Sequence, residues 1–256
     1  MATSRLSGPG PGQRSGVPAD KAIVVADGDV PAREALDAAW PGWEAGAFLV
    51  VAADGGWAKA KALGLSPTVL VGDADSLSEE AFAAAAATPG IEVARSRQDK
   101  DESDTELAVL AAFRRGARRV IVLGALGGKR FDHALANVGL LALPSPGQGA
   151  VELLDATTRV RLLRGAAAGQ DQAELVLDGP PGDVVSLLPF GAAAEGVTTD
   201  GLLFPLRGET LPPGPARGLS NVRTSPTARV SLRAGGLLIV ETRMDSAPMG
   251  AVRSES

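Results

Sequence analysis

The chain of 256 residues contains no cysteine and a single histidine, His133. The absence of cysteine excludes disulfide bonds, thiolate metal sites and cysteine nucleophiles, and a single histidine excludes a multi-histidine zinc site. No apolar run approaches the roughly 20 residues that a membrane-spanning helix needs. With a net charge of −5 and a pI near 5.1, the chain also lacks the positive charge typical of nucleic-acid-binding proteins. These absences predict a cytoplasmic protein that has neither a nucleic-acid nor a membrane partner.

The two ends of the chain differ in composition from its centre. Residues 1–20 are rich in Ser, Gly and Pro and lack the apolar core of a signal peptide, so we expect a disordered tail. Residues 244–256 are polar, and we expect a flexible tail there as well. Hydrophobic residues make up 45% of the whole chain, which is enough for a buried core.

Residues 21–145 alternate short apolar runs with helical patterns, and Gly64 and Gly116 stand where helices commonly end. This alternation predicts an N-terminal α/β domain, a mostly parallel sheet with helices on both faces. The expected strands are Ile23–Ala26, Phe48–Ala52, Val69–Val71, Ile91–Ala94 and Val120–Leu123, and the expected helices are Ala32–Ala39, Trp57–Leu63, Ser78–Ala87, Asp104–Arg115 and Asp132–Leu143.

The pattern changes after residues 144–149, a segment of Pro, Ser, Gly and Gln with the composition of a linker. Residues 150–243 show short apolar runs separated by turns and no convincing helix, which predicts a C-terminal all-β sandwich domain. The expected strands are Val151–Leu154, Arg159–Leu163, Glu174–Leu177, Val184–Leu188, Gly201–Pro205, Arg229–Leu232 and Leu237–Glu241.

The most informative motif follows the strand expected at Val69–Val71, where the chain reads Gly-Asp-Ala-Asp-Ser. Residues i and i+2 at a strand end point the same way, so Asp73 and Asp75 would present two carboxylates together. Neighbouring carboxylates repel each other unless a cation or a proton lies between them. An oxygen-only pair in this position suits Mg²⁺ bound with a phosphate. The same segment also reads as an ordinary helix start, with Ser76 as the N-cap and Glu79 completing a capping box.

Two glycine-containing loops follow other expected strands. The first, Asp54-Gly55-Gly56, lets backbone N–H groups approach a phosphate, although a plain turn capped by Asp54 is the simpler interpretation. The second, residues 124–133, combines glycines with Lys129 and Arg130 before a helix, which favours an anion. Arg130 has the geometry to clamp a phosphate with two hydrogen bonds. Basic residues that are merely solvated are the alternative.

A second acidic segment, residues 99–106, reads Asp-Lys-Asp-Glu-Ser-Asp-Thr-Glu. Ser103 and Glu106 fit a capping box, so helix initiation explains part of it. Its crowded carboxylates suggest cation binding, with a solvated charge run as the alternative. Taken together, two acidic and two glycine-containing loops at the strand ends of one sheet predict a site for Mg²⁺ and a polyphosphate. The chain has no P-loop motif and no dinucleotide-binding glycine motif.

The ordered set of these motifs resembles the thiamine pyrophosphokinase (thiamine diphosphokinase) family. The N-terminal matches are ADGG, GDADS, DKDESDTE and GALGGKRFDHALAN, and the C-terminal ones are LLPFG, EGVTTDGLLFPL and GLSN. The resemblance covers residues 21–243. It implies an α/β catalytic domain and a thiamine-binding β-sandwich, in a homodimer whose active site lies between the subunits. It further implies transfer of the diphosphoryl group of ATP to the hydroxyl of thiamine, giving thiamine diphosphate and AMP.

The resemblance also implies roles for individual residues. Asp73, Asp75 and Asp101 correspond to the Mg²⁺-binding acids, and Arg130 and Asp132 to a catalytic pair. Ser220 and Asn221 correspond to the thiamine-binding segment. The nucleotide-binding residues expected in the matching loops are Asp54, Gly55, Gly56, Ser103, Asp104, Gly127, Gly128, Lys129 and Asn137.

Some family members carry a tryptophan near the C-terminal end that stacks on the thiamine ring. All three tryptophans of this chain lie N-terminally, at positions 40, 43 and 57, so the group that holds the ring is open. Two other functions compete with thiamine diphosphorylation: diphosphoryl transfer to another primary alcohol such as a hydroxymethylpterin, and nucleotide binding without catalysis. The EGVTTDGL and GLSN segments argue against the first, and the intact Asp73, Asp75, Asp101 and Asp132 against the second.

Overall fold

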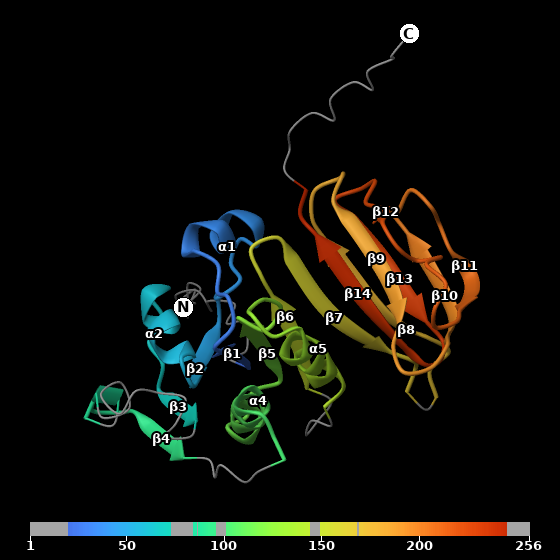
Figure 1. Ribbon diagram of the computed structural model, residues 1–256. Coiled ribbons are helices and arrows are strands. Elements are labelled where there is room, and N and C mark those ends of the chain that lie inside the picture. The colour runs from blue at the N-terminus through green and yellow to red at the C-terminus, as the bar shows by residue number, and fades with distance from the viewer. Residues whose placement is uncertain are drawn as a thin grey trace, which may run out of the picture.

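The computed structural model describes residues 20–72, 84–85, 87–95, 101–143, 149–167 and 169–244. Within them the chain forms a ten-stranded sheet, a four-stranded sheet and a set of helices (Figure 1). Both expected tails and the linker lie almost entirely outside the described residues, as does most of the helix expected at Ser78–Ala87. Within the described residues, no helix is both long and apolar enough to span a bilayer.

Six strands form the expected parallel sheet, in the order β6-β5-β1-β2-β3-β4. Every neighbouring pair among them is parallel. β6 was expected in the antiparallel part, but it pairs in parallel with β5 and therefore extends this sheet. The bounds are β1 Lys21–Val25, β2 Ala47–Ala53, β3 Val69–Gly72, β4 Glu92–Arg95, β5 Arg119–Leu123 and β6 Ala150–Leu154.

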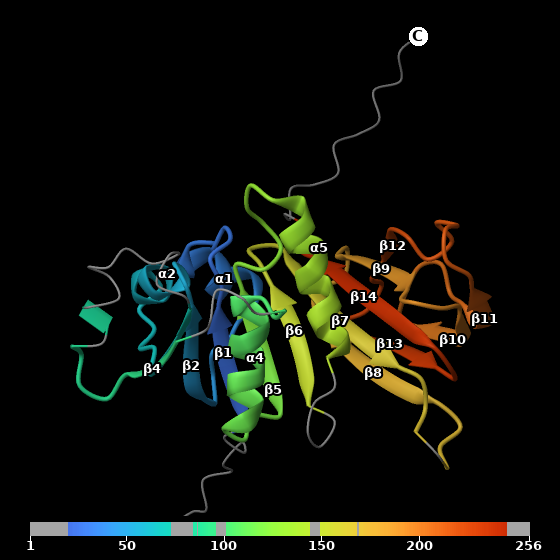
Figure 2. The same cartoon turned by 60° about the horizontal axis from the view of Figure 1, so that its bottom comes forward.

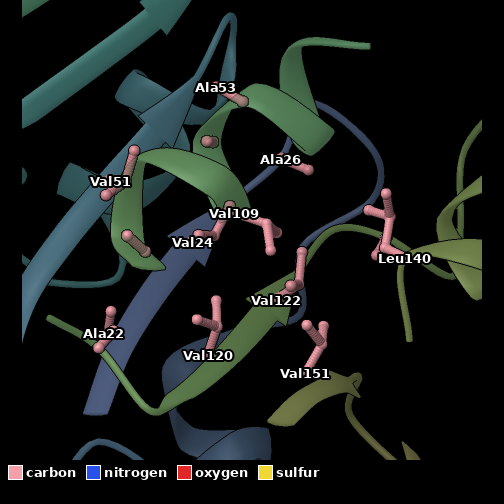
Figure 3. Close-up of a cluster of buried hydrophobic side chains, with 14 of the residues drawn as sticks. Ala22, Val24, Ala26, Val51, Ala53, Val109, Val120, Val122, Leu140 and Val151 are labelled. Atoms are coloured by element: carbon pink, nitrogen blue, oxygen red, sulfur yellow. The ribbon is translucent and has the colours of Figure 1, made fainter. Parts of the chain in front are cut away.

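Helices cover both faces of the parallel sheet, as the sequence predicts. On one face α4 packs through Val109 against apolar side chains of β1, β2 and β5 (Figure 3). On the other face Leu36 of α1 and the following Trp40 and Trp43 pack against Ile23 and its neighbours. Figure 2 shows α4 and α5 crossing the first face. The bounds are α1 Arg33–Ala39, α2 Gly56–Ala62, α4 Asp104–Arg114 and α5 Phe131–Gly139, followed by a short 3-10 helix, Leu140–Ala142.

The C-terminal part is the expected β-sandwich, and its first layer continues the parallel sheet. β7 pairs antiparallel with β6, and β14, β9 and β12 follow outward. A separate sheet in the order β11-β10-β13-β8 packs on this layer through an apolar core. The bounds are β7 Thr158–Arg164, β8 Ala173–Asp178, β9 Val184–Pro189, β10 Ala194–Asp200, β11 Arg207–Leu211, β12 Asn221–Val222, β13 Thr227–Leu232 and β14 Gly236–Thr242.

One strand prediction in the sandwich is wrong. Gly201–Pro205 was expected to be a strand, but it is the connection between β10 and β11. Gly201 has a φ of 73°, in the left-handed region that glycine favours. The chain therefore turns at Gly201, although the apolar residues that follow it suggest a strand. The sequence gives little signal for β10 and β11 because both contain few apolar residues: β10 buries Ala194, Val197 and Thr199, and β11 buries only Leu211.

A buried charge cluster lies on β7 and β14 of the sandwich. The Glu241 side chain, 2% exposed, accepts hydrogen bonds from Arg159 at 2.8 and 2.9 Å, from Arg161 at 2.6 Å and from Arg223 at 2.9 Å. Burial opposes ionisation of Glu241, but the hydrogen bonds and charges of Arg159 and Arg161 outweigh it, so the pKa of this carboxyl lies below its ordinary value. The ionised carboxylate of Glu241 therefore links β14 to β7 and to Arg223 within the antiparallel layer.

Candidate functional site

The carboxyl ends of the parallel strands meet at one edge of the sheet. Strands β2, β3 and β4 follow one another on one side of β1, whereas β5 pairs with β1 on its other side. Open α/β sheets bind ligands outside this edge, where the strand order reverses. The loops after β1, β2, β3 and β5 therefore define the candidate site.

The loop after β1, Asp27-Gly28-Asp29, is a part of the site that the sequence analysis missed. Gly28 donates its N–H to the carbonyl of Gly124 at 3.1 Å, so the β1 and β5 loops are joined directly. A Cβ at Gly28 would lie 2.2 Å from that carbonyl oxygen and 2.5 Å from the one of Gly127, which only glycine permits. An acid-glycine-acid sequence directly after a buried strand was the signal that could have found this loop.

The loop after β2 holds Asp54 at the boundary with β3. Asp54 has a φ of 50°, which is unusual for a residue other than glycine, and its N–H donates to the carbonyl of Val71 at 2.9 Å. A Cβ at Gly72 would lie 2.4 Å from Asp54 Oδ1, so this carboxylate lies against the last residue of β3. Asp73, the next residue along the chain, lies outside the described residues.

Asp54 does not cap α2, because the N-cap is Gly55 and no side chain caps that helix. Gly56 packs against β1, where a Cβ would lie 2.0 Å from the carbonyl oxygen of Val25. The β2 loop is therefore packed closely between β1 and β3. Glycine is required there for this packing, as well as for any approach of a phosphate.

The loop after β5 carries the expected basic residues and leads into α5. Arg130 Nε donates to Asp132 Oδ1 at 3.1 Å, and its Nη2 contacts the other carboxylate oxygen. The hydrogen bond from Arg130 is the main cause that lowers the pKa of Asp132, which is exposed and ionised at neutral pH. Asn137 Nδ2 donates to the carbonyl of Ala125 at 3.0 Å, so Asn137 ties α5 to the loop. Lys129 is exposed.

The second acidic segment is only partly described. Asp101 is exposed, and Ser103 caps α4 by accepting the N–H of Glu106 at 3.1 Å, as the helix-start interpretation predicts. The carboxylate pair Asp73 and Asp75 lies outside the described residues. Across the residues that the structure does describe, no three acidic or histidine side chains gather closely enough to hold a metal ion. The expected metal ligands are nevertheless all carboxylates, the donors that Mg²⁺ prefers.

The two expected thiamine-side residues lie on the sandwich beside β12. Ser220 has a φ of 57°, and its N–H donates to Ser186 Oγ at 3.0 Å. Asn221, 6% exposed, turns inward and accepts the N–H of Phe204 at 3.0 Å while donating to its carbonyl at 2.7 Å. Phe204 is 55% exposed, and Leu203 and Leu219 are exposed to a similar degree. Asn221 therefore fixes the loop that displays an aromatic side chain.

The sheet order keeps these residues away from the acidic loops of the same chain. β12 and β3 are separated by eight strand spacings, which at about 4.8 Å each amount to roughly 38 Å. A molecule the size of thiamine cannot bridge that distance. A single chain therefore does not bring β12, beside which Ser220 lies, close to β3.

A cleft of about 1160 Å³ lies elsewhere in the described part of the chain. It runs between α1 and β8 and is lined by Trp40, Glu152, Arg159, Asp183 and Arg243, among others. Two of its arginines are held in ion pairs: Arg159 with Glu241, which lies outside the lining, and Arg243 with Asp183. Arg159 and Arg243 also lie over the ring of Trp40, 4.7 and 4.1 Å from its centre. The cleft thus mainly marks the place where the α/β part of the chain meets the sandwich.

A parallel sheet that is covered by helices on both faces, has glycine-lined loops at its carboxyl edge and continues into a β-sandwich defines a two-part α/β protein. Two family models match it: thiamin pyrophosphokinase, catalytic domain, over residues 43–149, and thiamin pyrophosphokinase, vitamin B1 binding domain, over residues 173–237. The chain therefore belongs to the thiamin pyrophosphokinase family and is an enzyme of that family.

Solved structures share the fold. The thiamine pyrophosphokinase from Bacillus subtilis has 21% identity and a TM-score of 0.71, with 87% of this chain and 98% of that one covered. The thiamin pyrophosphokinase family protein from Enterococcus faecalis has 24% identity and a TM-score of 0.71, with coverage of 88% and 99%. The enzyme from Candida albicans has 15% identity and a TM-score of 0.66, with coverage of 89% and 91%. A comparison with curated proteins found no match.

Proposed function

We propose that the protein transfers the diphosphoryl group of ATP to the primary hydroxyl of thiamine and releases AMP. The observation that carries this proposal is the match of both parts of the chain, in order, to the catalytic and vitamin B1 binding models of one family. In the reaction, the thiamine oxygen bonds to the β-phosphorus, the bond from that phosphorus to the oxygen of the α-phosphate breaks, and the hydroxyl loses its proton. Catalysis of such a transfer rests on positioning and on offsetting charge.

The carboxyl edge of the sheet is proposed to bind the nucleotide. The glycine-lined loops let the backbone approach the phosphates, and Arg130 and Lys129 would face them with positive charge. Asp73, Asp75 and Asp101 would hold Mg²⁺, which when bound offsets the negative charge of the phosphates. Asp132 supports this arrangement because its carboxylate fixes the guanidinium of Arg130.

Phe204 is proposed to hold the thiamine ring in place of a C-terminal tryptophan. It is an exposed aromatic side chain whose backbone is fixed on both sides by Asn221. Aromatic side chains that are fixed in advance bind flat heteroaromatic rings at little entropic cost. Under this proposal Asn221 acts by positioning Phe204, and Ser220 borders the same surface.

A homodimer with a shared site is proposed because one chain separates its two half-sites by roughly 38 Å. Each half carries exposed apolar side chains: Phe131 and Leu135 on α5, next to the glycine-rich loop, and Leu203, Phe204 and Leu219 on the sandwich. In a two-fold dimer, the α5 patch of one chain can cover the sandwich patch of its partner, and the two-fold symmetry repeats this contact. That arrangement would bring the thiamine-side residues to the nucleotide loops.

The test is an assay of the purified protein with ATP, Mg²⁺ and thiamine. AMP and thiamine diphosphate should appear in equal amounts, and a hydroxymethylpterin offered instead should give no product. Release of ADP with thiamine monophosphate would contradict diphosphoryl transfer. Nucleotide binding without any product would favour a non-catalytic module.

A further inference from the structure

Lys59 connects two loops of the nucleotide edge that are distant in sequence. It lies on α2, after the β2 loop, and its Nζ donates to Asp27 Oδ1 at 2.8 Å and to the carbonyl of Gly28 at 2.9 Å. The same nitrogen also contacts the carbonyl of Asp27. One ammonium group thus uses all three of its donors on the β1 loop.

The β1 loop, which Lys59 holds, lies between the two glycine-containing loops. On one side, a Cβ at Gly55 would lie 2.0 Å from Asp27 Oδ1. On the other side, Gly28 contacts Gly124 and Gly127. A displacement of the β1 loop would therefore shift both loops that are proposed to receive the phosphates.

The positive charge of Lys59 also offsets the negative charge of Asp27 at the proposed nucleotide site. Asp27 follows β1 at the point where the strand order reverses, and an unpaired carboxylate there would repel a polyphosphate. The side chains of Lys59 and Asp27 are 35% and 58% exposed, and pairs this exposed contribute little to global stability. The contacts are therefore better explained by local positioning of the loop than by support of the fold.

We propose that Lys59 is a positioning residue for the nucleotide: it fixes the β1 loop between the two glycine-containing loops and neutralises Asp27. This inference rests on the proposed function. It assigns Lys59 no contact with the thiamine side, so its loss should affect the two substrates differently.

The test compares Lys59→Gln with the matched control Lys61→Gln. Lys61 lies on the same helix but contacts the ring of Trp57 at 5.4 Å, and not the β1 loop. Lys59→Gln should raise the KM for ATP about tenfold, with the KM for thiamine within about twofold of wild type. Lys59→Arg should recover most of the loss, because it keeps the charge and several donors. Equal KM values for ATP in the Lys59→Gln and Lys61→Gln variants would overturn the proposal.

Two further measurements separate this inference from the proposed function. Calorimetric titration with ATP and Mg²⁺, without thiamine, should show the same loss of affinity in Lys59→Gln and none in Lys61→Gln. If the wild type binds ATP but does not turn over thiamine, the proposed function fails while the role of Lys59 is still tested. In Asp27→Asn/Lys59→Gln the losses should be smaller than the product of the single losses. Fully multiplicative losses would show that Lys59 does not act through Asp27.

Discussion

The Asn221 side chain holds Phe204 by its backbone, accepting the N–H at 3.0 Å and donating to the carbonyl at 2.7 Å. The two residues are 17 positions apart, on β12 and in the connection between β10 and β11. Asn221 is buried while the ring that it fixes is exposed. Under the proposed function, the sequence motif that contains Asn221 acts through Phe204, whose exposed ring can stack on an aromatic substrate.

Phe204→Ala should raise the KM for thiamine about tenfold, since stacking of a base on an aromatic side chain is worth about 1–3 kcal/mol. The KM for ATP should stay unchanged. Asn221→Ala should have a similar effect, and the double variant should be no worse than either single one, because both remove the same surface. Val176→Ala, on the exposed face of β8, is the control. An unaltered KM for thiamine in Phe204→Ala would exclude ring stacking at this position.

Asp73→Asn or Asp75→Asn should abolish turnover while the protein stays folded. The reason is that two carboxylates at one strand end call for a cation between them. Steady-state assays and thermal unfolding should be run side by side, with Glu195→Gln as the control at an exposed ion pair. Activity within about tenfold of wild type, roughly 1.4 kcal/mol in the barrier, would rule out their assignment as metal ligands.

Mixing two impaired variants should restore part of the activity at low thiamine concentration if the site is shared. One variant carries Asp73→Asn and the other carries Ser220→Ala with Asn221→Ala. A mixed dimer would contain one site with both halves intact, so recovery of up to about a quarter of wild-type activity is expected for random pairing. Sedimentation should show a dimer at the assay concentration. A fully active monomer would refute the shared site.

Glu241→Gln should lower the free energy of unfolding by roughly 3–5 kcal/mol at pH 7, because the buried Arg223 and the partly buried Arg159 and Arg161 lose their common carboxylate. Glu195→Gln, at an exposed pair with Arg233, should cost about 0–1 kcal/mol. Since the pKa of Glu241 is lowered in the folded state, its contribution is present above about pH 4.3 and is lost as the pH falls through the folded pKa. Urea unfolding at pH 7 and pH 3 should show the difference shrinking at the lower pH.

Glu152→Gln should behave in the opposite way. Glu152 lines the cleft at the junction, and burial raises the pKa of its carboxyl despite the positive charges of Arg159 and Arg161. The folded state therefore favours the protonated form, and stability falls as the pH rises from about 4.3 through the folded pKa. The substitution should raise the Tm at pH 7.5 and leave it nearly unchanged at pH 4. A lower Tm at pH 7.5 would show that the ionised carboxylate is stabilising.

Local sequence patterns predicted most of the strands and helices, the parallel sheet, the sandwich and most of the loops at the carboxyl edge of the sheet. Alternating strands and helices can bury their apolar faces in few ways, and a parallel connection brings the loops after the strands to one edge. Local signals were enough for the helix start at Ser103 and for the glycines Gly64 and Gly116, which adopt positive φ as expected. Each of these features depends on residues close together in the chain.

Which side chains meet depends on the tertiary structure. It joined β6 and β7 into one continuous sheet, placed Lys59 on the loop 32 residues before it, and turned Asn221 inward onto Phe204. It also set the separation between β12 and β3, on which the proposed shared site of a dimer rests. The physical reason is that these contacts depend on strand order and on the packing of distant segments, which no local periodicity encodes.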